Sequence, residues 1–145
     1  LIVHCPFVFD GKWTEKHCMA GILQNIKSGG SFRPGTWGVA FIDELKPAKG
    51  DLVLEGKRAL SGFTNTGLKG QLRDRGTSSV VCAGFLTNVC VEATARSAYD
   101  KGFHVVVAKD ATAAGSRAAQ EYVEREVFPL LGAAMTVDEV LHTLE

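Results

Sequence analysis

Cys90 is the residue whose type and position are best suited to chemistry. It follows an apolar run at residues 80–83 and precedes a helical pattern at residues 93–99. This order predicts a strand that ends at Gly84, a short turn, and a helix that starts near Cys90. The free amides and the dipole of a helix N-terminus stabilise a thiolate and could hold the oxyanion that forms when sulfur attacks a carbonyl. Cys90 is therefore a candidate nucleophile, and the alternative is a small apolar side chain packed in the core.

Length and composition narrow the class of protein. The chain has 145 residues and a formal net charge of zero, which suits a single domain over residues 1–145 with a hydrophobic core. Its scattered charges favour neither a nucleic acid nor a membrane surface as a partner. The four cysteines, Cys5, Cys18, Cys82 and Cys90, match no zinc or redox-motif spacing. We therefore expect a reduced, cytoplasmic setting.

Apolar segments alternate with helical patterns along the chain. Strands are expected at residues 1–5, 51–55, 78–83, 103–108 and 133–135. Helices are expected at 15–27, from Thr66 to Gly76, from near Cys90 to Gly102, at 116–131 with a bend or break at Pro129, and from a capping box formed by Thr136 and Glu139. Residues 39–45 fit a short helix or an edge segment equally well.

The strands are apolar on both faces, which indicates a parallel sheet covered on both sides. The sequence thus predicts an α/β fold, a three-layer αβα sandwich with a mostly parallel, doubly wound, Rossmann-like sheet. Ligands in such folds bind beyond the carboxyl ends of the strands. The loops after Cys5, Glu55 and Ala83 all lie at such ends, so their residues can converge.

Three motifs carry a specific resemblance. Residues 83–96 (Ala-Gly-Phe-Leu-Thr-Asn-Val-Cys-Val-Glu-Ala-Thr-Ala-Arg) resemble the nucleophile motif of the isochorismatase-like cysteine hydrolases, a family with nicotinamidases, ureidoacrylate and biuret hydrolases and N-carbamoylsarcosine amidohydrolase. Residues 56–68 resemble its second motif, a lysine followed by Ser-x-Phe and Thr-x-Leu. Residues 102–114 resemble the strand and turn after the nucleophile helix. The motifs occur in the family's order over most of the chain.

The resemblance implies a catalytic set of Asp, Lys and Cys. Cys90 would attack the substrate carbonyl to form a thioester, and Lys57 would support the thiolate. The family's non-proline cis peptide maps to the Phe85–Leu86 bond, where it would aim the amides of Leu86 and Cys90 at one point to form an oxyanion hole. Phe63 would lie near the substrate. Trp37 would either wall the pocket or pack its own loop.

The catalytic aspartate has no match. The family places it after the first strand, in a motif like Asp-x-Gln-x-Asp-Phe, whereas Asp10 stands in the sequence Phe-Val-Phe-Asp-Gly-Lys. Residues 1–6 match the family's second strand better. We therefore expect an N-terminally incomplete domain that lacks a strand, its aspartate and a helix, roughly 30 or more residues. Without this aspartate, hydrolysis would lack its general base.

Other reactive residue types have structural interpretations. Cys82 and Cys5 are expected in the core, Asp110 in a turn at a strand end, and Arg96 in a salt bridge.

His4 and His17 do not reproduce the Asp-x-His pair and further His of the metal-dependent nicotinamidases. No metal and no other cofactor are therefore expected.

The leading hypothesis is a metal-independent cysteine hydrolase that cleaves a C–N bond of a small amide, ureido or carbamoyl substrate. The absent aspartate motivates an alternative, a catalytically degenerate binding or scaffold protein. A redox-sensing thiol protein is a weaker alternative. True isochorismatases cleave a vinyl ether and lack the cysteine, so Cys90 argues against that branch. The family resemblance implies a small-molecule substrate and a homo-oligomer, a dimer or tetramer.

Overall fold

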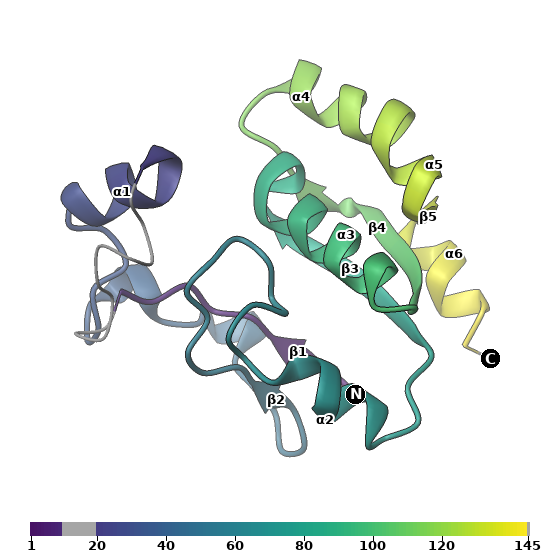
Figure 1. Ribbon diagram of the computed structural model, residues 1–145, viewed down its shortest axis with the longest axis horizontal. Coiled ribbons are helices and arrows are strands. Elements are labelled where there is room, and N and C mark those ends of the chain that lie inside the picture. Colours follow the sequence, from purple (N-terminus) through teal and green to yellow (C-terminus); the bar gives the residue numbers. More distant parts are fainter. Residues whose placement is uncertain (10–19, 145) are drawn as a thin grey trace. The chain divides into compact units, whose positions relative to one another are not determined.

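The computed structural model describes residues 1–9 and 20–144. They fall into two compact units, Leu1–Thr66 and Gly67–Glu145, and each unit is described here by itself (Figure 1). Every strand pairing is parallel, and helices connect the successive strands. The predicted α/β class is therefore confirmed, while the single domain over residues 1–145 stays a prediction. No helix in residues 1–9 and 20–144 is long and apolar enough to cross a membrane.

Unit 1 is built on a two-stranded parallel sheet. Strand β1 (Val3–His4) pairs with β2 (Leu52–Val53), with Val3 opposite Leu52. Between them the chain forms helix α1 (Gly21–Ser28) and two 3-10 turns, η2 (Trp37–Val39) and η3 (Asp43–Leu45). The ambiguous residues 39–45 thus contain a short helical turn and no strand pairing. The carboxyl ends of β1 and β2 lead into two of the loops that were expected to contribute residues to a ligand site.

Helix α1 overlaps the helix expected at residues 15–27. It ends at Gly29, and Gly30 follows with a φ of 74°, a conformation that glycine adopts readily. Its apolar side contributes Leu23 and Ile26 to a hydrophobic cluster around the buried Phe9. The cluster also includes Phe7 and Phe32. The first part of the expected helix, which contains His17 and Cys18, lies outside the described residues, and so does Asp10.

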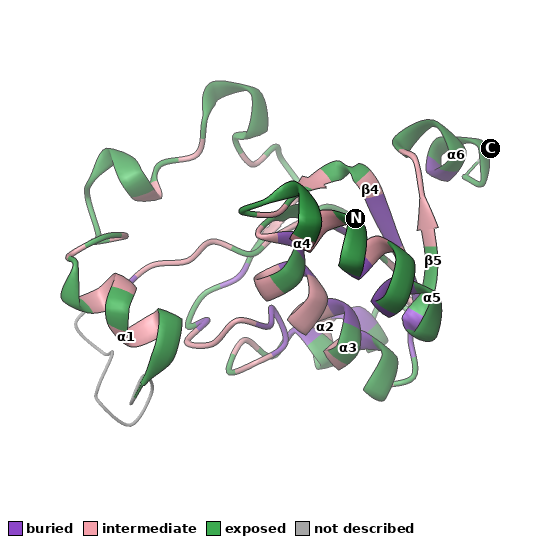
Figure 2. Cartoon of the chain, turned by 90° about the horizontal axis from the view of Figure 1, so that it is seen from above, coloured by how far each residue is buried: buried purple, intermediate pink, exposed green. Residues whose placement is uncertain are grey.

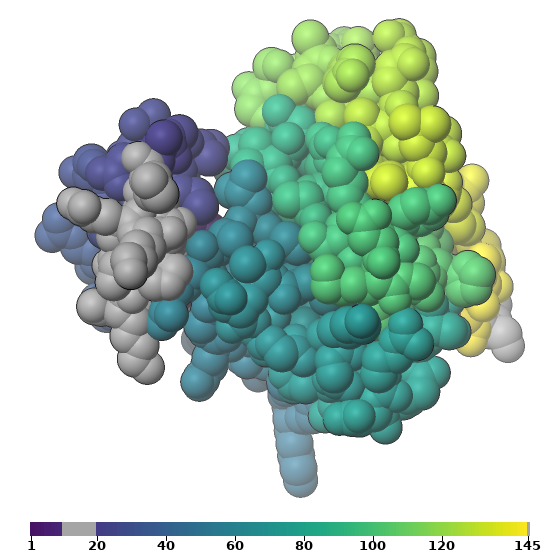
Figure 3. Space-filling model, viewed as in Figure 1, coloured from purple at the N-terminus to yellow at the C-terminus, as the bar shows by residue number. Residues whose placement is uncertain are grey.

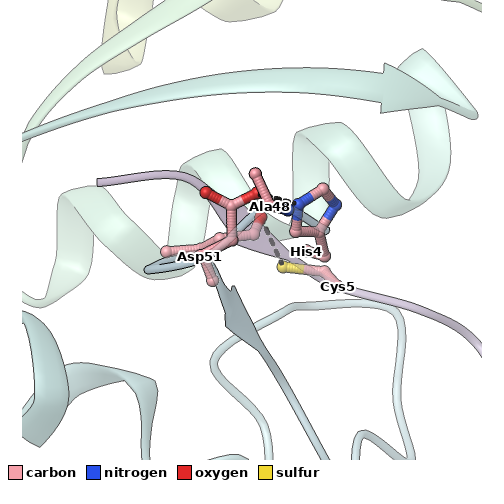
Figure 4. Close-up of polar contacts among 5 residues, drawn as sticks. His4, Cys5, Ala48 and Asp51 are labelled. Atoms are coloured by element: carbon pink, nitrogen blue, oxygen red, sulfur yellow. Dashed lines mark hydrogen bonds and ion pairs between the residues drawn. The ribbon is translucent and has the colours of Figure 1, made fainter. Parts of the chain in front are cut away.

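A hydrogen-bonded pair joins β1 to the turn that precedes β2 in unit 1. His4 Nε2 lies 2.9 Å from Asp51 Oδ2 (Figure 4). The Ala48 amide donates to the same oxygen at 2.9 Å, and the Asp51 amide donates back to the Ala48 carbonyl at 3.1 Å. The hydrogen bond with His4, followed by that from Ala48, holds the pKa of Asp51 below its usual value. The carboxylate form therefore ties the turn before β2 to β1.

Asp51→Asn is expected to lower the melting temperature of the protein near pH 7. Because the folded-state pKa of Asp51 is depressed, its ionised form stabilises the fold above the unfolded-state pKa, and this contribution is lost as the pH falls through the folded-state value. The difference in melting temperature between wild type and variant should therefore shrink from pH 7 toward pH 3. Thermal melts across this range measure it. A gap that does not change with pH would contradict a role for the charge.

Unit 2 holds a three-stranded parallel sheet in the order β3-β4-β5. The strands are β3 (Ser79–Phe85), β4 (His104–Ala113) and β5 (Gly132–Met135). The helical elements are α2 (Leu68–Arg73), the π turn η4 (Thr87–Val91), α3 (Glu92–Asp100), α4 (Arg117–Tyr122), the π turn η5 (Val123–Val127), α5 (Phe128–Leu131) and α6 (Val137–His142).

The core of unit 2 lies between the sheet and the helices that connect its strands. Helix α3 contacts β3, β4 and α5, so the helices after β3 and after β4 share one face of the sheet. Ala95 and Ala98 of α3 are fully buried, because their small side chains let the helix approach the strands closely. Val105 and Val107 of β4 and Phe128 of α5 are also buried (Figure 2). Cys82 is buried in β3, as the sequence predicted.

Helix starts in unit 2 follow the expected cap chemistry with one correction. Ser116 caps α4, and the capping box of Thr136 and Glu139 is present at α6, which confirms that prediction. Thr66 does not cap α2. The cap is Gly67, whose left-handed φ of 68° suits glycine, and the Thr66 hydroxyl donates instead to the Gly62 carbonyl.

The region around β4 and β5 differs from the expectation in two places. Asp110 lies within β4 rather than in a turn, and its carboxylate accepts a 2.8 Å hydrogen bond from the Val137 amide at the start of α6. Its role is structural, as predicted, but the partner is a helix that follows the next strand. The expected break at Pro129 occurs as the π turn η5, directly before the short α5 that contains the proline.

Candidate active site

The turn after β3 carries the candidate nucleophile. Strand β3 ends at Phe85, the Phe85–Leu86 peptide bond is cis, and the helical segment begins at Thr87. The helix thus starts before Cys90 rather than at it, which corrects the expected boundary. The cis bond lies where the family resemblance placed one. Phe85 is exposed and Leu86 is half-buried, and their part in an oxyanion hole stays a prediction.

Cys90 lies in a π turn instead of a regular α-helical turn. The Leu86 carbonyl accepts hydrogen bonds from the amides of Val89 and Val91, each 3.1 Å long, so the turn is wider than an α-helical one. The Thr94 hydroxyl donates to the Cys90 carbonyl at 2.7 Å. Single π turns inside helices occur frequently at functional sites. Cys90 forms no disulfide with another described cysteine, and the residue is half-buried.

Lys57 follows β2 in unit 1 and is only 7% exposed. Its Nζ lies 4.9 Å from the centroid of the Phe7 ring, a cation–π arrangement that stabilises a desolvated ammonium. A buried lysine is rare among lysines, which separates Lys57 from an ordinary surface cation. Lys57 belongs to unit 1 and Cys90 to unit 2, so each half of the site is described separately, and their pairing stays a prediction.

Cys5 was expected in the core, but it is exposed at the carboxyl end of β1. Desolvation nevertheless raises the pKa of its thiol, and the charge of Lys57 acts in the opposite direction. The reason for the wrong prediction is that β1 comprises only Val3–His4, so Cys5 already belongs to the following loop. That loop is one of the three strand ends expected to face a ligand.

A pocket of about 410 Å³ opens at the strand ends of unit 1. Pro6 and Val8 line it from the loop after β1, and residues 53–58 line it from β2 and its loop. Arg58 lies beside Lys57 in this wall, and its Nε is buried without a hydrogen-bond partner in the described part of the chain. An unpaired buried guanidinium N–H is costly, so this atom is suited to an acceptor from a ligand. The sequence analysis did not single out Arg58.

The two predicted aromatic contacts lie in different surroundings. Phe63 is buried in the loop after Lys57, where its amide donates to the Ser61 hydroxyl at 3.1 Å. Trp37 is 92% exposed in η2. Such exposure leaves it little contact with its own loop, and a part in a pocket wall stays a prediction.

The salt bridge expected at Arg96 can be compared with the structure. Arg96 Nε pairs with Glu92 Oε1 at 2.9 Å, one turn earlier on α3, which agrees with the expected salt bridge. Residues 1–9 and 20–144 contain no group of three or more His, Cys, Asp or Glu side chains arranged to hold a metal ion.

Sequence reasoning also missed the surroundings of Thr87. This residue is fully buried, and its hydroxyl donates to Gln120 Oε1 on α4 at 2.6 Å. The only sequence signal was the i, i+4 spacing of Gln120 and Glu124, which gives no hint of a contact with the nucleophile turn.

The fold and the π turn that contains Cys90 define an α/β protein with a cysteine at a strand-to-helix junction of a parallel sheet. The chain belongs to the isochorismatase domain family, whose model matches residues 1–139. Ureidoacrylate amidohydrolase RutB from Methylorubrum extorquens is 44% identical over 99 residues, which are 68% of this chain and 40% of that protein. The chain therefore spans about two fifths of the length of this curated relative.

Solved structures agree with this assignment. An isochorismatase-like hydrolase from Alkaliphilus metalliredigens matches with a TM-score of 0.82 and 29% identity, over 99% of this chain and 72% of that one. N-carbamoylsarcosine amidase from Thermoplasma acidophilum matches with a TM-score of 0.64 and 34% identity, over 77% of this chain and 63% of that one.

Proposed function

We propose that the protein hydrolyses a C–N bond of a small amide, ureido or carbamoyl compound, with Cys90 as nucleophile. The observation that carries the proposal is the half-buried Cys90 thiol in the π turn directly after β3. Membership of the isochorismatase family supports it. So do the names of two relatives, a ureidoacrylate amidohydrolase and an N-carbamoylsarcosine amidase.

In the proposed reaction the Cys90 sulfur attacks the carbonyl carbon and forms a C–S bond. The C–N bond then breaks, the nitrogen leaves with a proton as an amine or ammonia, and a thioester remains. Water adds to the thioester, the C–S bond breaks, and the thiol is restored as the acid product departs. The amides of Leu86 and Cys90 would stabilise the oxyanion in both steps.

Lys57 would stabilise the thiolate and the developing negative charge in this reaction. Its burial against Phe7 supports the role, because charge–charge interactions strengthen when water is excluded. No described residue has been matched to the aspartate that would move the proton.

The unit 1 pocket supports a substrate that carries a carboxylate. Lys57 and Arg58 both line it, and Arg58 has a buried Nε without a partner in the described residues. Guanidinium groups bind carboxylates with directed, charge-assisted hydrogen bonds. Ureidoacrylate and N-carbamoylsarcosine, which appear in the relatives' names, each bear one carboxylate.

Arg58→Gln is expected to lower kcat/KM for ureidoacrylate by about 10- to 100-fold, mainly through a higher KM, because a charge-assisted hydrogen bond contributes about 1.5–3 kcal/mol. Turnover of a neutral amide such as nicotinamide, if the enzyme accepts one, should change far less. The matched control is Arg33→Gln, an exposed arginine of the same unit, which should leave both substrates unaffected. Equal losses on charged and neutral substrates would refute the carboxylate contact.

The proposed activity is tested by ammonia release from ureidoacrylate, N-carbamoylsarcosine and nicotinamide, measured with the whole protein. Release that depends on Cys90 supports the proposal. Saturable binding of one of these compounds without any turnover would instead establish the alternative, a binding protein.

A cytoplasmic location and assembly into a dimer or tetramer belong to the same proposal. The family resemblance supports an assembly. Analytical ultracentrifugation of the whole protein measures the oligomeric state.

A further inference from the structure

A polar cluster in unit 2 connects the nucleophile turn to the helix after β4. Helix α4 lies on the surface of unit 2, in light green in Figure 3, and it carries the half-buried Gln120. Its Oε1 accepts the 2.6 Å hydrogen bond from the buried Thr87 hydroxyl, and its Nε2 donates to Thr112 Oγ1 of β4 at 3.0 Å and to Glu124 Oε1 at 2.6 Å. One amide thus joins three separate elements.

The partners of Gln120 determine which way its amide points. Glu124 in its carboxylate form only accepts hydrogen bonds, so the amide nitrogen must face Glu124 and the amide oxygen must face Thr87. The Thr112 hydroxyl donates to the Lys109 carbonyl at 2.9 Å, which leaves its oxygen to accept from Gln120. The Thr87 hydroxyl must therefore donate. With that, the Gln120 side chain has used its oxygen and both N–H groups.

Thr87 is the first residue of the π turn that contains Cys90, and it is the one fully buried polar side chain among the described residues. A buried hydroxyl without a partner costs about 1–3 kcal/mol. Loss of Gln120 would therefore favour rearrangements of the turn that let Thr87 find another acceptor. Such a shift would displace the sulfur, and a misplacement of about 1 Å can lower a rate by about 100-fold.

We propose that Gln120 is a positioning residue that holds the π turn of Cys90 in place through Thr87, with its amide oriented by Glu124. It does not touch the substrate. The inference rests on the proposed function only for its kinetic readout, since the reactivity of the Cys90 thiol reports on the turn without any substrate.

The test compares Gln120→Leu, Gln120→Glu and the double variant Gln120→Glu/Glu124→Gln in the whole protein. Two quantities are measured: the alkylation rate of Cys90 by iodoacetamide, followed by peptide mass spectrometry, and kcat and KM on the best substrate. We expect the single variants to change the alkylation rate at least threefold and to lower kcat by about 10- to 100-fold with KM changed less than threefold.

The double variant should recover most of both quantities. Its carboxylate at position 120 would still accept from Thr87, and its amide at position 124 would now donate to that carboxylate, so only the bond to Thr112 is lost. A role of Gln120 that depends only on the size of its side chain predicts no such recovery, because Gln and Glu have nearly the same size.

The matched control for the Glu124→Gln change in the double variant is Glu121→Gln, which alters an exposed carboxylate of α4 that pairs with Arg117. It should leave both quantities unchanged. Unaltered alkylation and kcat in folded Gln120→Glu, or no recovery in the double variant, would overturn the proposal. Altered Cys90 alkylation without turnover of any substrate would sustain the positioning role and overturn the proposed hydrolysis instead. If Gln120→Leu does not fold, the comparison of Gln120→Glu with the double variant decides whether Gln120 positions the turn.

Discussion

Cys90→Ala is expected to abolish hydrolysis, with kcat at least about 10⁴-fold below wild type, because loss of a covalent nucleophile removes the only group able to form the intermediate. Substrate binding should persist, since the variant deletes a single sulfur from a half-buried position. The measurement is ammonia release under saturating substrate, together with calorimetric titration of the same substrate into the variant.

The matched control for this experiment is Cys82→Ala. It removes the same atom eight residues earlier in the chain, from a thiol that is buried in β3. We expect a modest loss of stability and nearly unchanged kcat. Full activity of Cys90→Ala would end the case for a thioester mechanism, whereas equal losses in both variants would point to general destabilisation.

Lys57→Met carries the second largest expected effect, a fall in kcat of about 10- to 1000-fold. An opposite charge close to an anion favours it by an amount equivalent to about 1–3 pKa units, and methionine keeps much of the apolar stem that packs in unit 1. Because Lys57 is 7% exposed and its ammonium lies over the Phe7 ring, methionine also removes a buried cation–π contact, so a modest loss of stability is expected beside the fall in kcat. Steady-state kinetics and thermal melts measure the two effects.

A second readout tests whether Lys57 and Cys90 act together. Lys57→Met should slow alkylation of Cys90 near neutral pH, because the cation would no longer support the thiolate. Lys46→Met, which changes an exposed lysine paired with Asp43, is the matched control and should alter neither kinetics nor alkylation. If Cys90 reacts equally fast with and without Lys57, the two residues are not neighbours, and the catalytic pairing must be abandoned.

Much of the local structure followed from short-range chemistry in the sequence. The capping box at α6 was predicted correctly, because caps depend on residues within one turn of each other. The strand positions were also correct, since runs of apolar residues indicate strands buried in a parallel sheet. Boundaries were less accurate. Strand β4 continues past Asp110 because Thr112 and Ala113 pair with Gly84 and Phe85 of β3 after a shift in register, a contact between distant segments.

The sequence by itself determined the family, the α/β class and the identity of Cys90 and Lys57 as candidates, because these depend on motifs and on the order of apolar and polar residues. Only the tertiary structure decided that Cys90 lies in a π turn, that Lys57 is buried against Phe7, and that Gln120 holds Thr87. The physical reason is the same in each case. Burial and side-chain hydrogen bonds depend on groups that folding brings together from distant parts of the chain, and local spacing carries no record of them.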